Sequence, residues 1–343
     1  MDLRFTAEQE QLVDAFGGLY AKHCSTEHVR AAEASGHDPE LWDRLAELGV
    51  LPMAVAEVDG GWGASFLDLA VAAEQQGRVV APVPVIETQV AARLLARTGD
   101  AAAEALAAAL TGDRMITFAP RAARGTLATL VPAGSVADAA VILAGDRLLL
   151  VSLDGTRTPV ENLASMALAD IAIPASATIL AEGPDAVAAH DEALDEWMAL
   201  TGAALVGIAG RALEIGVEYV KERKAWGVPI GTFQAISHRL ADSAAAIDGA
   251  RLLAYEAAWA RDERGPRTAE LAAMSFAFAY ETARDITYRS LHFHGGYGFM
   301  MEYDIQLYYR RARGWANVFA EPDRVYQRVA DRRYGSPATP GGR

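Results

Sequence analysis

Residues 223–255 read RKAWGVPIGTFQAISHRLADSAAAIDGARLLAY and join two long, alanine-rich stretches whose apolar residues recur at helical spacing. Arg223 and Lys224 end the first stretch, where cations complement the negative end of a helix. Glycines and a proline then break the chain, and we expect Thr232 to cap the helix that follows. The segment therefore predicts a helical hairpin.

This hairpin lies inside a larger helical pattern that covers residues 183–334. The apolar spacing predicts helices over 185–224, 232–263, 268–293, 304–315 and 324–334. Long helical stretches with short connections favour a C-terminal four-helix bundle. The polar tail, residues 335–343, is predicted to be flexible.

The chain before the bundle divides into a helical part and a β part. Residues 1–112 predict an N-terminal helical domain, in which Thr6 and Gln9 form a capping box and Asp38 caps a helix that begins with Pro39. The segment APVPV is expected to be extended. Helical periodicity is lost over 113–182, where short apolar runs lie between Gly, Pro and Asp, at 115–119, 126–132, 139–145, 147–152 and 168–174. The fold class is therefore mainly α, with a small middle β domain of sandwich or barrel type, in the order α–β–α.

Composition excludes several functions. The net charge of −14 argues against nucleic-acid binding, which needs a basic surface. No apolar run reaches the ~18 residues of a membrane span, and the first residues lack the features of a signal peptide. Cys24 is the single cysteine, so no internal disulfide is possible. We expect a cytoplasmic protein without a membrane span.

Most motif-like stretches have an ordinary structural interpretation. DGGWG (59–63) lacks the frame of a phosphate loop and is interpreted as a surface turn. His292 and His294 have no partners at metal-ligand spacing, so no metal site is expected. Two features each have two interpretations. Arg223 with Lys224 beside a glycine turn could bind an anion or could simply end a helix. HGGYG (294–298) could let a ligand approach the backbone closely or could simply end a helix.

The spacing of these two features resembles that of the acyl-CoA dehydrogenase family of flavoproteins. The matching residues are Arg223, Trp226, Gly227, Pro229, Ile230, Phe233, Gln234, Leu240, Ala241, Asp242, Gly295, Gly296, Gly298, Glu302 and Tyr303. The likeness is strong over 200–310, moderate over 1–90 and weak in the β region.

The resemblance implies an FAD-dependent enzyme that oxidises an acyl-CoA thioester to the 2,3-enoyl-CoA. In that family a carboxylate removes the pro-R α-proton while flavin N5 takes the β-hydride, and an electron-transfer protein accepts the electrons. FAD lies between subunits, and its adenosine-pyrophosphate end is held by the neighbouring subunit. By resemblance, that neighbour's contribution here consists of Arg223, Trp226, Phe233, Gln234, His292, Gly295 and Gly296.

The sequence departs from the family where a subunit serves its own flavin. The usual position of the catalytic Glu holds Phe319, and the alternative position, on the long helix before the hairpin, holds Trp197. Neighbouring carboxylates are Glu321, Asp323 and Glu196, so the catalytic residue stays unknown. The family's flavin loop and its Trp-Ile-Thr strand are missing from the β region.

This asymmetry resembles the short subunits of bacterial hetero-oligomeric acyl-CoA dehydrogenases of lipid or steroid breakdown. It predicts a subunit that completes the FAD site of a longer catalytic homologue in an α2β2-type assembly. Two alternatives are a self-sufficient homo-oligomer with a relocated base among Glu321, Asp323 and Glu196, and a non-catalytic subunit that binds an acyl thioester.

Overall fold

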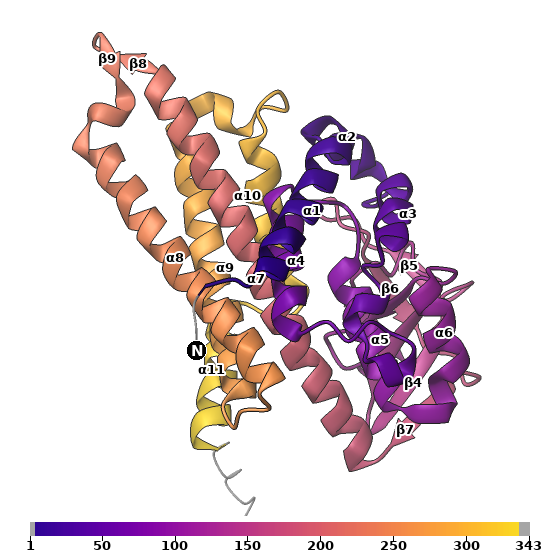
Figure 1. Ribbon diagram of the computed structural model, residues 1–343. Coiled ribbons are helices and arrows are strands. Elements are labelled where there is room, and N and C mark those ends of the chain that lie inside the picture. Colours follow the sequence, from indigo (N-terminus) through magenta and orange to yellow (C-terminus); the bar gives the residue numbers. More distant parts are fainter. Residues whose placement is uncertain (1–3, 336–343) are drawn as a thin grey trace, which may run out of the picture.

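The computed structural model describes residues 4–335, and three regions follow one another along the chain (Figure 1). The first is helical. Its α-helices are α1 (Ala7–His23), α2 (Thr26–Ala31), α3 (Pro39–Leu48), α4 (Phe66–Arg78), α5 (Val85–Arg97) and α6 (Ala103–Thr111). Short 3-10 turns between them are η1 (Ala32–Ala34), η2 (Pro52–Ala54), η3 (Glu57–Asp59) and η4 (Gly99–Ala102).

Local signals set several of these helix ends as predicted. The capping box of α1 is confirmed, with Thr6 Oγ1 accepting from Gln9 N at 3.2 Å and Gln9 Oε1 accepting from Thr6 N at 3.1 Å. Asp38 Oδ1 accepts from Leu41 N at 3.1 Å and caps α3. The extended interpretation of residues 81–85 was wrong at its end, because Val85 is the first residue of α5.

The β region contains two small sheets, in which consecutive strands pair in β3–β4 and β5–β6 and strands further apart in sequence pair in β1–β3, β2–β6 and β4–β7. Its strands are β1 (Ile116–Phe118), β2 (Leu127–Val131), β3 (Ala139–Ala144), β4 (Arg147–Ser152), β5 (Arg157–Pro159), β6 (Ala169–Ala172) and β7 (Thr178–Glu182). One sheet has the order β1-β3-β4-β7 and the other β2-β6-β5, and only the β1–β3 pair is parallel. The five apolar runs became β1, β2, β3, β4 and β6, while β5 and β7 were not predicted.

The third region is the helical bundle. It contains α7 (Pro184–Glu222), α8 (Gln234–Asp262), α9 (Thr268–Phe293), α10 (Ile305–Asn317) and α11 (Pro322–Tyr334). The bundle of α7, α8, α9 and α10 is present, and α11 packs on α9. The described helical region ends at Thr111 and α7 begins at Pro184, close to the predicted limits, but the division into domains stays a prediction.

Helix α7 runs through the centre and contacts all three regions (Figure 1). Small residues bring α4 against it, since a Cβ on Gly77 would lie 1.9 Å from Ala204 O and one on Gly207 would lie 2.1 Å from Glu74 O. Within residues 4–335, α7 is long and apolar enough to cross a membrane, but 72% of its most apolar window is buried inside the protein. It therefore has the character of a core helix.

Candidate functional site

The connector between α7 and α8 is a small hairpin that extends from one end of the bundle (Figure 1). Its strands are β8 (Lys224–Ala225) and β9 (Val228–Pro229), followed by the turn η5 (Ile230–Thr232). Trp226 and Gly227 form the tip with φ of 52° and 83°, and two successive positive φ angles are typical of a tight hairpin turn. The predicted helical hairpin therefore carries a β-turn at its tip.

The predicted cap of α8 was wrong. Thr232 Oγ1 donates to Pro229 O at 2.7 Å, within the connector, and Phe233 takes the N-cap position without a side-chain bond. Thr232 is too far from the first helical N–H groups because the turn η5 lies before the helix.

The second predicted segment lies at the same end of the bundle. HGGYG follows α9 and forms the turn η6 (Gly295–Phe299), with Gly295 at φ 61°. Tyr219, one turn before Arg223 on α7, stacks on His294 with ring centroids 3.9 Å apart. Its hydroxyl donates to His294 O at 3.5 Å. The end of α7 and the start of the glycine segment are thus joined.

The side chains predicted to meet a cofactor are accessible. Trp226 is 91% exposed, and its ring meets Phe233 edge-on at 5.8 Å. Arg223, Gln234 and His292 are exposed, and none of them forms an ion pair or polar side-chain bond with another residue between 4 and 335. A Cβ on Gly296 would meet no atom within 4 Å. We call these residues with Gly295 the bundle arm. Whether they hold a cofactor stays a prediction.

The two positions where the family resemblance leads us to expect a base come together in space and are occupied by aromatic residues. Trp197 of α7 and Phe319, after α10, have ring centroids 6.2 Å apart. Phe276 of α9 completes the cluster, at 5.4 Å from Trp197 and 6.4 Å from Phe319. None of these rings can accept a proton. Trp197 and Phe319 are far apart in the sequence, and the structure packs their rings into one cluster.

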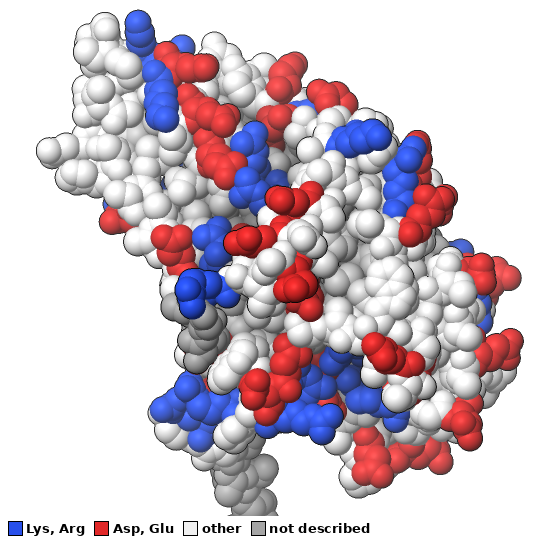
Figure 2. Space-filling model, in the orientation of Figure 1, with Lys and Arg blue, Asp and Glu red and all other residues white. Residues whose placement is uncertain are grey.

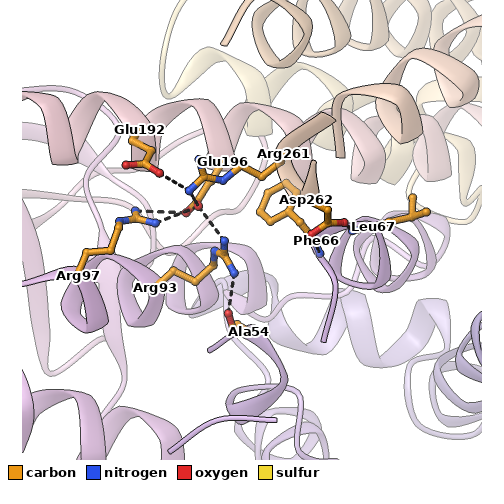
Figure 3. Close-up of polar contacts among 9 residues, drawn as sticks. All are labelled: Ala54, Phe66, Leu67, Arg93, Arg97, Glu192, Glu196, Arg261 and Asp262. Atoms are coloured by element: carbon orange, nitrogen blue, oxygen red, sulfur yellow. Dashed lines mark hydrogen bonds and ion pairs between the residues drawn. The ribbon is translucent and has the colours of Figure 1, made fainter. Parts of the chain in front are cut away.

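Glu196, one of the candidate bases, is locked in a cluster of three arginines (Figure 3). Its side chain is fully buried, and Oε1 lies 3.0 Å from Arg93, 3.0 Å from Arg97 and 2.6 Å from Arg261. Burial alone would raise the pKa of Glu196, but the three guanidinium groups outweigh it and lower that pKa to about 2. A carboxylate so stabilised is a poor base, and its ion pairs connect α7 to α5 and α8.

The other two candidates lie in a groove. Glu321 and Asp323 are exposed and line a groove of about 750 Å³ between the β region and the start of α11, with Arg121 and Arg324 on its wall. Arg121 donates to the carbonyls of Phe319 at 2.9 Å and Asn317 at 3.0 Å. This side chain follows β1 and fastens the β region to the end of α10.

One carboxyl near the aromatic cluster was not predicted. Glu87 of α5 accepts a bond from Trp197 Nε1 at 3.3 Å, and burial raises its pKa. Glu87 and Trp197 are far apart in sequence, so only the packing of α5 on α7 brings them together. In the sequence, the one sign that Glu87 could matter is that it is a single carboxylate in an apolar stretch.

Comparison with known proteins identifies the family. The model of the acyl-CoA dehydrogenase C-terminal domain matches residues 188–316, and that of the N-terminal domain matches residues 6–111. Acyl-CoA dehydrogenase IpdE2 of Mycolicibacterium smegmatis is 32% identical over 329 residues, which cover 94% of this chain and 97% of that protein. The chain belongs to the acyl-CoA dehydrogenase family.

Two solved structures share the fold over nearly the whole chain. The Tcur3481–Tcur3483 steroid ACAD G363A variant has a TM-score of 0.87 at 29% identity and covers 95% of this chain and 97% of its own. The ChsE4–ChsE5 complex from Mycobacterium tuberculosis has a TM-score of 0.88 at 25% identity and covers 98% of this chain and 100% of its own. The α–β–α fold class predicted from the sequence is confirmed.

Proposed function

We propose that this chain is the subunit of an FAD-dependent acyl-CoA dehydrogenase that completes the FAD site of a longer, homologous catalytic partner. The observation that carries the proposal is the contrast between the two family sites. The bundle arm is accessible, while Trp197 and Phe319, at the two positions where the resemblance leads us to expect a base, are aromatic and pack against Phe276.

The bundle arm fits the diphosphate end of FAD. Arg223 offers a guanidinium with no ion-pair partner among residues 4–335, and Gly295 and Gly296 leave their backbone open to approach. Guanidinium groups and open backbone N–H groups are suited to phosphate oxygens. Trp226 and Phe233 add ring faces at the same end. When bound, FAD would supply the acceptor for the β-hydride of the acyl-CoA, and this chain would anchor the cofactor.

The flavin ring is expected to lie in the partner. The cavity between the β region, α5, α7 and α10 measures only about 60 Å³, while the groove lined by Phe319, Glu321 and Asp323 measures about 750 Å³. Because that groove has room for a ring, the assignment to the partner depends on the aromatic residues Trp197 and Phe319 at the positions expected for the base.

An uncharged flank of the bundle is available for that partner. Figure 2 shows few charged side chains over α8, while Lys and Arg side chains lie at the end of the bundle that carries the β8–β9 hairpin. Large apolar side chains there and on α9 are exposed, namely Trp226, Val228, Leu252, Trp259, Phe278 and Tyr288. Apolar surface of this kind marks protein contacts. We propose an α2β2-type assembly through this flank.

The similarity to the Tcur3481–Tcur3483 steroid ACAD and to the ChsE4–ChsE5 complex supports a hetero-oligomer and a steroid- or lipid-derived acyl-CoA. By the family resemblance we also propose a cytoplasmic protein whose electrons pass to an electron-transfer acceptor protein.

Co-expression with a longer homologue tests this proposal. A stable complex that contains FAD and oxidises acyl-CoA, with neither chain active alone, is expected. Full activity in a preparation of this chain by itself would contradict it.

A second candidate, a self-sufficient enzyme, is favoured by one observation. Glu87 lies beside Trp197 with a raised pKa, as a buried general base would. In that case Glu87→Gln would abolish turnover by the chain alone, whereas Glu321→Gln and Asp323→Asn would show whether the groove carboxylates act instead.

A further inference from the structure

Both segments of the bundle arm begin where a helix of the bundle ends, and the two helices are close together there. Helix α7 ends at Glu222 and α9 ends at Phe293. A Cβ on Gly216 of α7 would lie 2.6 Å from Ser290 Oγ of α9, so the two helices are in contact shortly before their ends. The residues that follow on both helices therefore lie between the two segments of the arm.

Tyr219 and His294 form the next layer of this helix contact. Residue 219 follows 216 by three positions and residue 294 follows 290 by four, which places each one turn further along. The two rings stack with centroids 3.9 Å apart and planes 23° from parallel. His294 is 4% exposed, and Tyr303 meets its ring edge-on at 5.7 Å. The imidazole is thus packed against two tyrosines.

A hydrogen bond fixes the orientation of the imidazole. His294 Nδ1 lies 2.7 Å from Ser290 O, and because a carbonyl oxygen only accepts, Nδ1 carries the proton. Burial lowers the pKa of His294, so the ring is neutral at pH 7. The hydroxyl of Tyr219 adds only a long bond of 3.5 Å to His294 O. The link between α7 and α9 at this layer is therefore mainly the contact of the two rings.

The same two residues hold the backbone on both sides of the arm. Arg223 N donates to Tyr219 O at 2.9 Å, and Arg223 O accepts from Ile230 N at 2.8 Å, which places Arg223 at the base of the hairpin. On the other side, the peptide bond joins His294 directly to Gly295. A continuous series of contacts thus runs from Arg223 to Gly295 through the stacked pair.

The glycines depend on this series because they have little packing of their own. A Cβ on Gly295 or Gly296 would meet no atom of residues 4–335 within 4 Å. Gly298 is packed, since its Cβ would lie 2.4 Å from Leu291 O and 3.2 Å from His294 Cβ. The turn is therefore fixed through His294 and the end of α9, and it is open at the two glycines.

We propose that Tyr219 and His294 are positioning residues of the cofactor site, which set the distance between Arg223 and the glycine pair. This inference rests on the proposed function, in which these two segments hold the diphosphate end of FAD. Groups that bind one diphosphate act best at a fixed distance, and setting that distance before binding reduces the ordering that binding requires.

Hydrogen exchange of the purified chain, read by mass spectrometry, tests the link without any cofactor. The N–H groups of Arg223 and Ile230 are protected by backbone hydrogen bonds on the α7 side of the stack. His294→Leu, a change on the α9 side, should speed their exchange. Tyr219→Phe keeps the ring and should exchange as the parent does. Unchanged exchange of these two groups in His294→Leu would overturn the inference.

The FAD affinity of the hetero-oligomer, measured by fluorescence titration, tests the positioning role. Tyr219→Leu and His294→Leu should each weaken FAD binding about tenfold, the equivalent of one aromatic contact, and Tyr219→Phe should stay within about twofold of the parent. In an Arg223→Gln background, Tyr219→Leu should cost less than about threefold, because a residue that acts through Arg223 then has less to position. Equal losses in the two backgrounds, or a tenfold loss in Tyr219→Phe, would overturn the role.

Two controls keep the outcomes apart. Arg121→Gln loosens the chain away from the arm and should leave FAD affinity unchanged. If His294→Leu does not fold, Tyr219→Leu replaces it, with exchange read at the Met300 N–H, which is bonded to Tyr297 O at 3.0 Å. Unchanged FAD affinity in Arg223→Gln alone would overturn the proposed function itself. Faster exchange without a loss of FAD affinity in Tyr219→Leu would overturn only the positioning role.

Discussion

The bundle arm and the interior of the same chain differ in how accessible their side chains are. At the arm, Arg223 and Trp226 are exposed and Gly296 leaves open space beside its backbone. In the interior, Trp197 and Phe319 are in ring contact and Arg121 ties the β region to α10. The arm is accessible from outside the chain, whereas the positions of Trp197 and Phe319 are filled by packed rings.

The difference suggests how a subunit can lose one half of a shared site and keep the other. A flavin between two subunits needs one set of residues from each, and we propose that this chain supplies the set of the bundle arm. Changes in the interior should therefore alter stability and leave cofactor affinity unchanged. Changes in the arm should alter cofactor affinity and leave stability unchanged.

The largest expected effect is on stability and comes from Glu196. Glu196→Gln leaves Arg93, Arg97 and Arg261 without their shared carboxylate, which should cost about 3–5 kcal/mol of the free energy of unfolding. Urea denaturation measures it. Glu192→Gln is the matched control, since its side chain is 41% exposed and contacts only Arg261, and it should cost less than about 1 kcal/mol. Normal stability with abolished turnover in Glu196→Gln would instead make Glu196 a catalytic base.

Because of Glu196, we also expect the free energy of unfolding to depend on pH. The folded state lowers the pKa of Glu196 from 4.5 to about 2, so its contribution is complete above the unfolded value and is lost as the pH falls from 4.5 toward 2. The lowering corresponds to about 3 kcal/mol. The difference in unfolding free energy between the parent and Glu196→Gln should shrink over this window. A difference that stays constant across it would contradict this assignment.

An effect on cofactor affinity alone is expected at Arg223. Arg223→Gln in the hetero-oligomer should weaken FAD binding by about 10–100-fold, the equivalent of one or two charge-assisted hydrogen bonds. Stability should change little because Arg223 is exposed. Fluorescence titration with FAD measures the affinity, and Lys221→Gln, an exposed cation one residue before the helix end, is the control. Equal affinities in both variants would remove Arg223 from the site.

A moderate loss of stability is expected at Arg121. Arg121→Gln removes two bonds to the carbonyls of Asn317 and Phe319 and should cost about 1–2 kcal/mol, with FAD affinity of the hetero-oligomer unchanged. Arg124→Gln removes a neighbouring cation that repels Arg121 and should be neutral or slightly stabilising. Loss of FAD in the Arg121 variant would show that the interior still serves a cofactor.

The smallest expected effect compares two glycines of one turn. Gly296→Ala should leave folding unchanged, because its Cβ would meet nothing within 4 Å, yet weaken FAD binding several-fold if a cofactor lies against this backbone. Gly298→Ala should destabilise the chain, since its Cβ would lie 2.4 Å from Leu291 O. Thermal unfolding and FAD titration of both variants check this, and unchanged affinity in Gly296→Ala would place the cofactor elsewhere.

Sequence patterns predicted the elements whose cause is local. The capping box at Thr6, the cap at Asp38 and five strands depend on neighbours within a few residues. The elements that were not predicted depend on partners distant in sequence or on unusual backbone angles. Strand β5 is exposed along its length and is defined by pairing with β6, and the hairpin tip places Trp226 at a positive φ that few side chains adopt.

In the candidate site, too, some residues could be predicted from the sequence and others could not. The residues of the bundle arm were predicted from the resemblance to the family, and the structure brings their two segments to one end of the bundle through Tyr219. The roles of Glu196, Glu87 and Arg121 were out of reach, because each is set by contacts between regions far apart in the chain. A carboxylate beside an expected catalytic position resembles a base until the three arginines around it are seen.

The most direct test of the central claim is the flavin content of the purified chain, alone and after assembly with a longer homologue. The account predicts almost no bound FAD in the chain alone and about one FAD per pair of chains in the complex, released when Arg223 is replaced. Stoichiometric FAD in the lone chain, retained after Arg223→Gln, would contradict it.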